Sequence, residues 1–195
     1  MKLIRTLDKL LERNRVPITI SLAIYFITFI IGALSFYFLN PDMSNLENFC
    51  PNCDFQVKLT TLSIMRNNGI MIATLISGFF SLGLTTFTNL VLNGFTFGIA
   101  IADAVNVSSP LTTILLIIMP HAIFELPAIW IAGAAGFKIP YELVRYFTEK
   151  KDYILNRQEV IDFLMLTGCA VALIVIAAII EANVTKRIAE TVNHL

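Results

Sequence analysis

Pro120-His121-Ala122-Ile123-Phe124-Glu125-Leu126-Pro127 sets an imidazole and a carboxylate inside an apolar run long enough to cross a lipid bilayer. Ionisable side chains at that depth are costly and rarely accidental. His121 and Glu125 are four residues apart, so a helix brings them to one face, where they can pair. Pro120 and Pro127 each lack a backbone donor, which predicts helix breaks beside the two polar groups. The pair either fixes helix packing or takes a direct part in transport or chemistry.

The composition of the chain indicates an integral membrane protein. Of its 195 residues, 56% are hydrophobic and 14% are charged, whereas a soluble domain carries about 25% charged residues. The formal net charge of zero argues against a nucleic-acid partner, because such partners require a basic surface. The sequence contains no glycine-rich phosphate loop, nucleophile elbow or zinc-protease helix. We therefore expect no enzyme activity.

The apolar segments predict an all-α fold, a polytopic bundle of transmembrane helices that forms a single membrane domain over residues 1–195. A helix needs about 20 apolar residues to cross the hydrocarbon core of a bilayer. Five segments meet this requirement, at residues 16–39, 68–86, 87–105, 111–137 and 160–183. The polar residues 85–89 predict a tight turn between the second and third spans. A broken or re-entrant pair over residues 68–105 is the alternative.

Basic residues gather in two segments. Residues 1–15 hold five Lys or Arg and residues 138–159 hold five more, out of 14 in the chain. With five spans both segments lie on one side, which the positive-inside rule makes cytoplasmic. The carboxyl terminus and the loop at residues 40–66 then lie outside the cell membrane. Both basic segments have apolar residues at helical spacing, which is typical of amphipathic helices at a membrane surface. The second is either a connecting helix or a docking surface.

Cys50 and Cys53 form a Cys-Pro-Asn-Cys motif in the predicted external loop. Two cysteines at this spacing supply half of a zinc site or a redox pair. No second Cys or His pair lies nearby in the sequence, and an oxidising compartment favours a disulfide or free thiols over a metal. The two cysteines are therefore weak metal candidates, and we expect no metal and no cofactor.

Small residues indicate where helices approach one another closely. Gly94 and Gly98 form a GxxxG motif in the third predicted span. Ala128, Ala132 and Gly136 continue at four-residue spacing in the fourth. We expect these two faces to meet, and the motif allows both packing within one chain and a homodimer. Asparagines in the same region predict a polar cluster built from several helices.

One set of motif residues is spread over the last two thirds of the chain. It comprises Asn67, Asn68, Asn93, Gly94, Gly98, Pro120, His121, Glu125, Gly133, Gly136, Glu181 and Thr185. In order and spacing this set resembles the stage II sporulation protein M family of multi-span membrane proteins. Ala122 stands where that family usually has glycine, and Lys186 stands where proline often follows the final threonine. The loop with Cys50 and Cys53 is not part of the pattern.

The resemblance implies a multi-span membrane protein with no established catalytic residues. The family's namesake resembles a membrane anchor that holds cell-wall hydrolases in a complex during spore engulfment. A membrane scaffold, surrounded by lipid and organising other membrane or membrane-associated proteins, is therefore the first hypothesis. The alternative is a transporter component in which His121 and Glu125 form a midplane site, coupled to a cytoplasmic ATPase. An intramembrane hydrolase has less support, because no nucleophile or third metal ligand accompanies the pair.

Overall fold

The computed structural model describes residues 2–39, 61–106 and 111–181, and these residues form helices with no strand among them. The elements are α1 (Lys2–Arg13), α2 (Arg15–Leu39), α3 (Thr61–Ile76), the short 3-10 helix η2 (Ser77–Phe79), α4 (Leu84–Asn106), α5 (Leu111–Gly136), α6 (Lys138–Phe147) and α7 (Arg157–Ile180). The predicted all-α class is confirmed.

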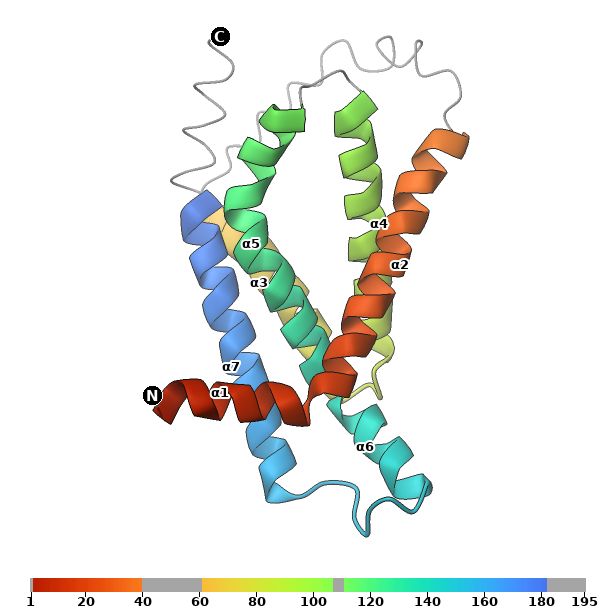
Figure 1. The fold of residues 1–195 in the computed structure, drawn as a ribbon, viewed down its shortest axis with the longest axis vertical. Helices are drawn as coiled ribbons and strands as arrows, with labels where there is room; N and C mark the ends of the chain where they lie inside the picture. The colour runs from red at the N-terminus through yellow and green to blue at the C-terminus, as the bar shows by residue number, and fades with distance from the viewer. Residues whose placement is uncertain (1, 40–60, 107–110, 182–195) are drawn as a thin grey trace.

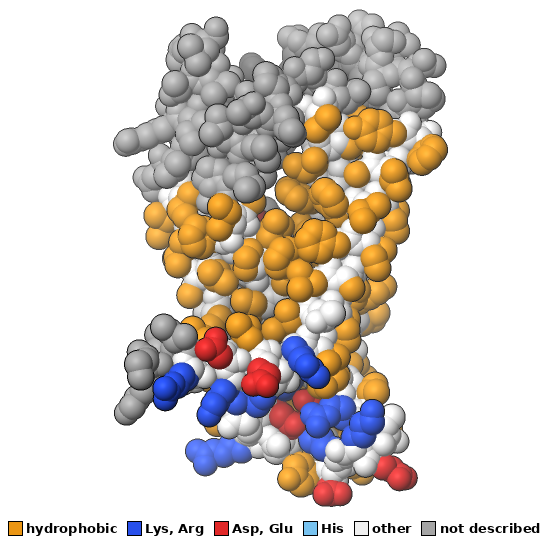
Figure 2. All heavy atoms as spheres, in the orientation of Figure 1, with side chains coloured by type: hydrophobic (Ala, Val, Ile, Leu, Met, Phe, Trp, Pro, Cys, Tyr) orange, Lys and Arg blue, Asp and Glu red, His pale blue; other side chains and the backbone are white. Residues whose placement is uncertain are grey.

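The long helices form two groups that meet at one end of the bundle. α2 packs on α4, and α5 packs on α7, with α3 against both α5 and α7. The groups lie together where α1 and α6 are found and diverge toward the opposite end (Figure 1). α1 lies across this closed end, and α6 extends from it. Figure 2 shows Lys, Arg, Asp and Glu gathered at the same end, below a broad hydrophobic surface.

The close packing of α2 on α4 depends on glycines. A methyl group at Gly98 would lie 2.1 Å from the carbonyl oxygen of Phe29, and one at Gly32 would lie 2.1 Å from the carbonyl oxygen of Phe95. Gly94 faces α2 in the same way. A side chain at these positions would force the two backbones apart. The GxxxG motif therefore packs on α2 within one chain, and the expectation that it meets the small-residue face of α5 is wrong.

Apolar side chains from five helices form the main core. Its most deeply buried members are Ile72, Leu75, Leu90, Ala128, Ala132, Ala170 and Ala177. The alanines lie on α5 and α7, and small side chains let two membrane helices approach closely. Leu10 of α1 is buried in a second cluster with Leu166 of α7. This contact attaches the amphipathic amino-terminal helix to the bundle.

The connection between α3 and α4 lies earlier in the chain than the sequence predicts. Gly83 adopts a φ of +84°, which glycine tolerates, and its N–H donates to the carbonyl of Gly78 at 2.7 Å. The polar residues 85–89 lie inside α4, where Thr86 donates to the carbonyl of Leu75 at 2.6 Å and Thr88 donates to that of Leu84 at 3.0 Å. Their hydroxyls are satisfied within the bundle and require no turn. The predicted boundary between residues 86 and 87 is wrong.

The prolines of α5 do not break it. The helix is continuous from Leu111 to Gly136, so the breaks predicted at Pro120 and Pro127 are wrong. Proline's fixed φ suits a helix, and the ring here removes backbone hydrogen bonds without ending the element. The break lies instead at Phe137, after which α6 continues at an angle of 41°.

Three described helices are long and apolar enough to cross a membrane, over Arg15–Phe38, Leu84–Val105 and Arg157–Ile180. The bent pair of α5 and α6 makes a fourth if it is counted as one span. α3 begins inside the predicted external loop. With 16 residues it is shorter than a helix that crosses a membrane by itself. The described residues therefore support three to four spans where the sequence predicts five.

Candidate functional site

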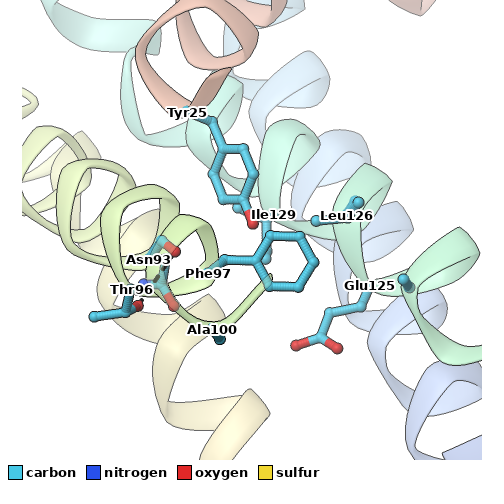
Figure 3. Close-up of a pocket in the computed structure, with 9 residues that line it drawn as sticks. Tyr25, Asn93, Thr96, Phe97, Ala100, Glu125, Leu126 and Ile129 are labelled. Atoms are coloured by element: carbon cyan, nitrogen blue, oxygen red, sulfur yellow. Dashed lines mark hydrogen bonds between the residues drawn. The ribbon is translucent and has the colours of Figure 1, made fainter. Parts of the chain in front are cut away.

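A cavity lies between α2, α4 and α5 at the level of Glu125. It has a volume of about 360 Å³ and is lined by Tyr25, Asn93, Thr96, Phe97, Ala100, Ala122, Glu125, Leu126 and Ile129. Figure 3 shows Glu125 extending from α5 toward α4, while Phe97 extends from α4 toward α5. Mostly apolar walls with a few polar groups are the usual composition of a small-molecule site.

Glu125 supplies the one carboxyl among the described side chains that line this cavity. Glu125 is half-buried on α5, and Glu181 at the end of α7 is close enough to act on it electrostatically. The hydroxyl of Tyr25 on α2 is also within the field of Glu125. Among the described side chains that line the cavity there is no Lys or Arg. The carboxyl of Glu125 therefore has no Lys or Arg partner in the described lining.

The polar residues that α4 contributes present acceptors to the cavity. Asn93 uses its amide nitrogen to donate to the carbonyl and the side-chain oxygen of Asn89, both at 2.8 Å. Thr96 donates its hydroxyl to the carbonyl of Leu92 at 2.8 Å. Once these donors are used within α4, the lone pairs of the two side-chain oxygens are what remain. Asn93 and Thr96 therefore add hydrogen-bond acceptors to those that Glu125 supplies.

Trp130 lies just outside the cavity wall. Its ring centre is 6.2 Å from that of Tyr25, which lines the cavity, and 5.6 Å from that of Phe26. Its indole N–H is buried without a partner among the described atoms. Because Trp130 is the one tryptophan of the chain, its fluorescence reports on this region alone.

A second polar site, the basal ion cluster, joins α1, α6 and α7 at the closed end of the bundle. The cluster consists of Arg13, Lys138, Glu142, Arg145, Lys151, Glu159 and Asp162. Asp162 is 1% exposed and accepts two hydrogen bonds from Arg13, at 2.9 and 2.6 Å. Lys138 is 2% exposed and donates to Asn14 at 2.6 Å. Asp162 and Lys138 are thus both hydrogen-bonded to Asn14, which lies between α1 and α2.

Glu142 of α6 is the centre of the other half of the cluster. Its oxygens lie 3.4 Å from Lys138, 3.0 Å from Arg145 and 3.0 Å from Lys151. Lys151 also contacts Glu159, the residue that completes a capping box with Asn156 at the start of α7. Burial raises the pKa of Glu142, but the hydrogen bond from Lys151 and the neighbouring cations outweigh it, so the pKa is lowered from its usual value.

The predicted site residues have different outcomes. Asn93, Glu125 and Glu181, which come from three separate helices, are brought to one region. Gly136 packs against α3 and α4, since a methyl group there would lie 2.0 Å from the hydroxyl of Thr86. Gly133 faces Ser21 of α2.

Other predicted residues take no described part in the cavity. Asn68 is buried on α3, and Asn67 beside it is exposed. The side chains of Pro120 and His121 lie outside the described residues, as do Cys50, Cys53 and Thr185. The His121–Glu125 pair therefore stays a prediction. Within the described part of the chain no group of three His, Cys, Asp or Glu is arranged to hold a metal ion.

The basal ion cluster was not predicted from the sequence. Asp162 lies near the start of a strongly apolar run and its partners lie far away in the sequence. Two local signals were available, namely the capping-box spacing of Asn156 and Glu159 and the four-residue spacing of Lys138 and Glu142. Neither signal identifies Arg13 as the partner of Asp162, because that pairing depends on how α1 packs on α7.

The described elements are those of an all-α protein, and its three to four long apolar helices are compatible with a membrane protein. The family model for Stage II sporulation protein M matches residues 21–186. The chain belongs to this family. A relative from Methanocaldococcus jannaschii, called an uncharacterized protein, is 38% identical over 176 residues, which cover 90% of this chain and 97% of the relative. No solved structure matches the chain significantly.

Proposed function

We propose that the chain is a membrane scaffold that crosses the bilayer five times, with its amino terminus in the cytoplasm and its carboxyl terminus outside. In this proposal the crossings are α2, α3 continued by η2, α4, α5 and α7, because α3 alone is short for a span and η2 follows it directly. Their chain direction alternates along the bundle (Figure 1). Support for the orientation comes from α1 and α6, which carry the basic segments to the same end. α7 ends at the opposite end.

The observation that carries the scaffold proposal is an apolar surface held in place by the basal ion cluster. Val144 is 61% exposed, Phe147 is 73% exposed and Tyr153 is 57% exposed, all in or just after α6. They lie on the charged end of the molecule, away from the main hydrophobic surface. Glu142, two residues before Val144 and five before Phe147 on α6, is fixed by three cations. An exposed apolar patch with a charged rim is typical of a protein-binding surface.

Partner capture tests this proposal. The tagged chain is purified in mild detergent after cross-linking, and co-purifying proteins are compared between the native chain and a Val144→Ser, Phe147→Ser double variant. Glu149→Ala is the matched control, because Glu149 is exposed at the same end. We expect the double variant to lose a membrane-associated partner that the control retains. Identical capture by all three chains would contradict a scaffold surface on α6.

The cavity around Glu125 favours a second candidate function, a membrane component of a transporter. A transport site needs polar groups from several helices near the middle of the bilayer. Glu125, Asn93 and Tyr25 meet this requirement from α5, α4 and α2. Co-purification of a cytoplasmic ATPase, with a flux that Glu125→Gln abolishes in reconstituted vesicles, would support this candidate. Recovery of extracytoplasmic enzymes alone would favour the scaffold.

A further inference from the structure

We propose that the cavity between α2, α4 and α5 binds an alkylammonium ion, an amine cation that carries a short apolar chain. The proposal goes beyond both candidate functions, because a bound cation could be cargo for a transporter or a regulatory ligand of a scaffold. It concerns binding alone and is tested without either activity.

A carboxyl with no Lys or Arg beside it in the described lining favours a cation. Glu125 lines it, Glu181 lies within electrostatic range, and Tyr25 adds a neutral hydroxyl. His121 precedes Glu125 by four residues on α5, with its side chain outside the described residues. Since the described lining includes no Lys or Arg, a phosphate or carboxylate group would meet repulsion there. A cation instead gains a charge-assisted hydrogen bond to Glu125.

The hydrogen-bonding groups select a donor. Asn93 and Thr96 spend their donors on carbonyl and amide oxygens of α4 and leave oxygen lone pairs for a ligand. Glu125 contributes further acceptors. An ammonium group carries up to three N–H donors and no acceptor. It therefore matches these three side chains better than a hydroxyl or a carbonyl group does.

The apolar walls and the size of the cavity select an organic cation over a bare metal ion. Phe97, Leu126 and Ile129 line the space beside the polar groups, and the volume is about 360 Å³. Ca²⁺ requires about six to eight oxygen ligands at close range, whereas four polar side chains line this much larger space. An alkyl chain fills apolar volume, and the aromatic rings attract a cation.

The test uses n-butylammonium chloride as the probe and n-butanol as its neutral counterpart. The full-length chain in detergent is titrated with each compound, and binding is followed by the fluorescence of Trp130 and by calorimetry. We expect saturable binding of n-butylammonium with at least about tenfold higher affinity than n-butanol, because the charged hydrogen bond is lost in the alcohol. Equal affinity for the two compounds would overturn the proposal.

Variants locate the binding. Glu125→Gln keeps the shape of the side chain and removes its charge, and we expect about a tenfold loss of affinity for n-butylammonium. Asp103→Asn is the matched control, because Asp103 is exposed on α4 and does not line the cavity. Ala100→Phe adds a large side chain at the cavity wall and keeps Glu125, and it should lower the affinity at least as much. If Glu125→Gln unfolds, the affinity of Ala100→Phe decides whether the cavity is the binding site. Native affinity in a folded Glu125→Gln or Ala100→Phe chain would overturn the proposal.

Discussion

Arg13, the last residue of α1, and Asp162, near the start of α7, form a two-pronged ion pair with N–O distances of 2.9 and 2.6 Å. The pair joins residues 149 positions apart in the sequence. Arg13 is partly exposed, whereas Asp162 is almost fully buried. The ion pair joins α1 to α7 at the charged end of the bundle. The pair therefore acts together with the buried contact of Leu10 and Leu166 to hold α1 against α7.

Asp162→Asn should strongly destabilise the protein. The change removes the charged partner of Arg13 and the farther of the two carboxylates near the buried ammonium of Lys138, which keeps Glu142 at 3.4 Å. Removing one member of a buried ion pair costs roughly 3–5 kcal/mol. Thermal and denaturant unfolding in detergent measures the effect. Asp152→Asn, at an exposed position in the segment before α7, is the control and should change stability by less than about 0.5 kcal/mol. Equal stability of the two variants would remove the structural role of Asp162.

Acid should weaken the closed end of the bundle through Glu142. The pKa of this carboxyl is lowered in the folded protein because the bond from Lys151 and the charges of Lys138 and Arg145 outweigh its burial. Because the pKa of Glu142 is lower in the folded protein, its ionised carboxyl stabilises the fold at pH values above its unfolded-state pKa of 4.5. This stabilisation is lost as the pH falls through the pKa of the folded state. We expect the melting temperature to fall steeply below about pH 4.5.

The Glu142→Gln variant separates this effect from general acid sensitivity. It should be less stable than the native chain at pH 7 and should lose less stability on acidification. Glu149→Gln, at an exposed position on the same segment, should keep the native pH profile. Parallel pH profiles for the native chain and Glu142→Gln would show that Glu142 does not carry the acid response.

Gly98→Ala should loosen the contact between α2 and α4. The added methyl group would lie 2.1 Å from the carbonyl oxygen of Phe29, a backbone atom that cannot rotate away. Overpacking of this kind costs roughly 1–3 kcal/mol. Gly168→Ala is the control, since no atom lies within 4 Å of a methyl group there, and it should be neutral or stabilising by up to about 1 kcal/mol. If Gly98→Ala unfolds at the same temperature as Gly168→Ala, the close approach is not needed for stability.

The sequence predicts the helical class and most helix positions because apolar length is a local property. α2 and α5 begin and end within a few residues of the predicted spans. The α3–α4 connection is mispredicted because threonine hydroxyls bond to carbonyls in the bundle, while Gly83 supplies the turn. The polar residues 85–89 therefore lie within α4 and do not form a turn.

The partners of each predicted contact are harder to obtain from sequence. GxxxG identifies α4 as a close-packing helix, but only the fold shows that its partner is α2. Likewise Glu125 stands out in the sequence, whereas the cavity that it lines is made by side chains from three helices. Spacing along one helix fixes which residues share a face. Which helix covers that face depends on the packing of the whole bundle.

Cysteine labelling tests the proposed topology. After replacement of the native cysteines, single cysteines are introduced at Asp8, Asp103 and Asp152, which are all exposed. We expect positions 8 and 152 to react with a membrane-impermeant reagent only after the cells are opened, because α1 and the α6–α7 segment lie at the proposed cytoplasmic end. Position 103, near the far end of α4, should react in intact cells. Labelling of all three from one side would rule out the five-span arrangement.

His121 and Glu125 should interact on one face of α5. The helix is continuous through both positions, so their four-residue spacing places them one turn apart on the same side. A neutral imidazole can donate a hydrogen bond to the carboxylate and leave its negative charge facing the cavity. Removing one partner leaves the other polar group unsatisfied in an apolar region, which costs more than removing both. We therefore expect His121→Leu and Glu125→Leu to destabilise the bundle more individually than together. A double-mutant cycle of thermal stability in detergent measures the coupling, with Asp103→Leu in place of Glu125→Leu as the uncoupled control. Additive effects of the two substitutions on stability would show that His121 and Glu125 do not interact, and Glu125 would then be assigned to the cavity alone.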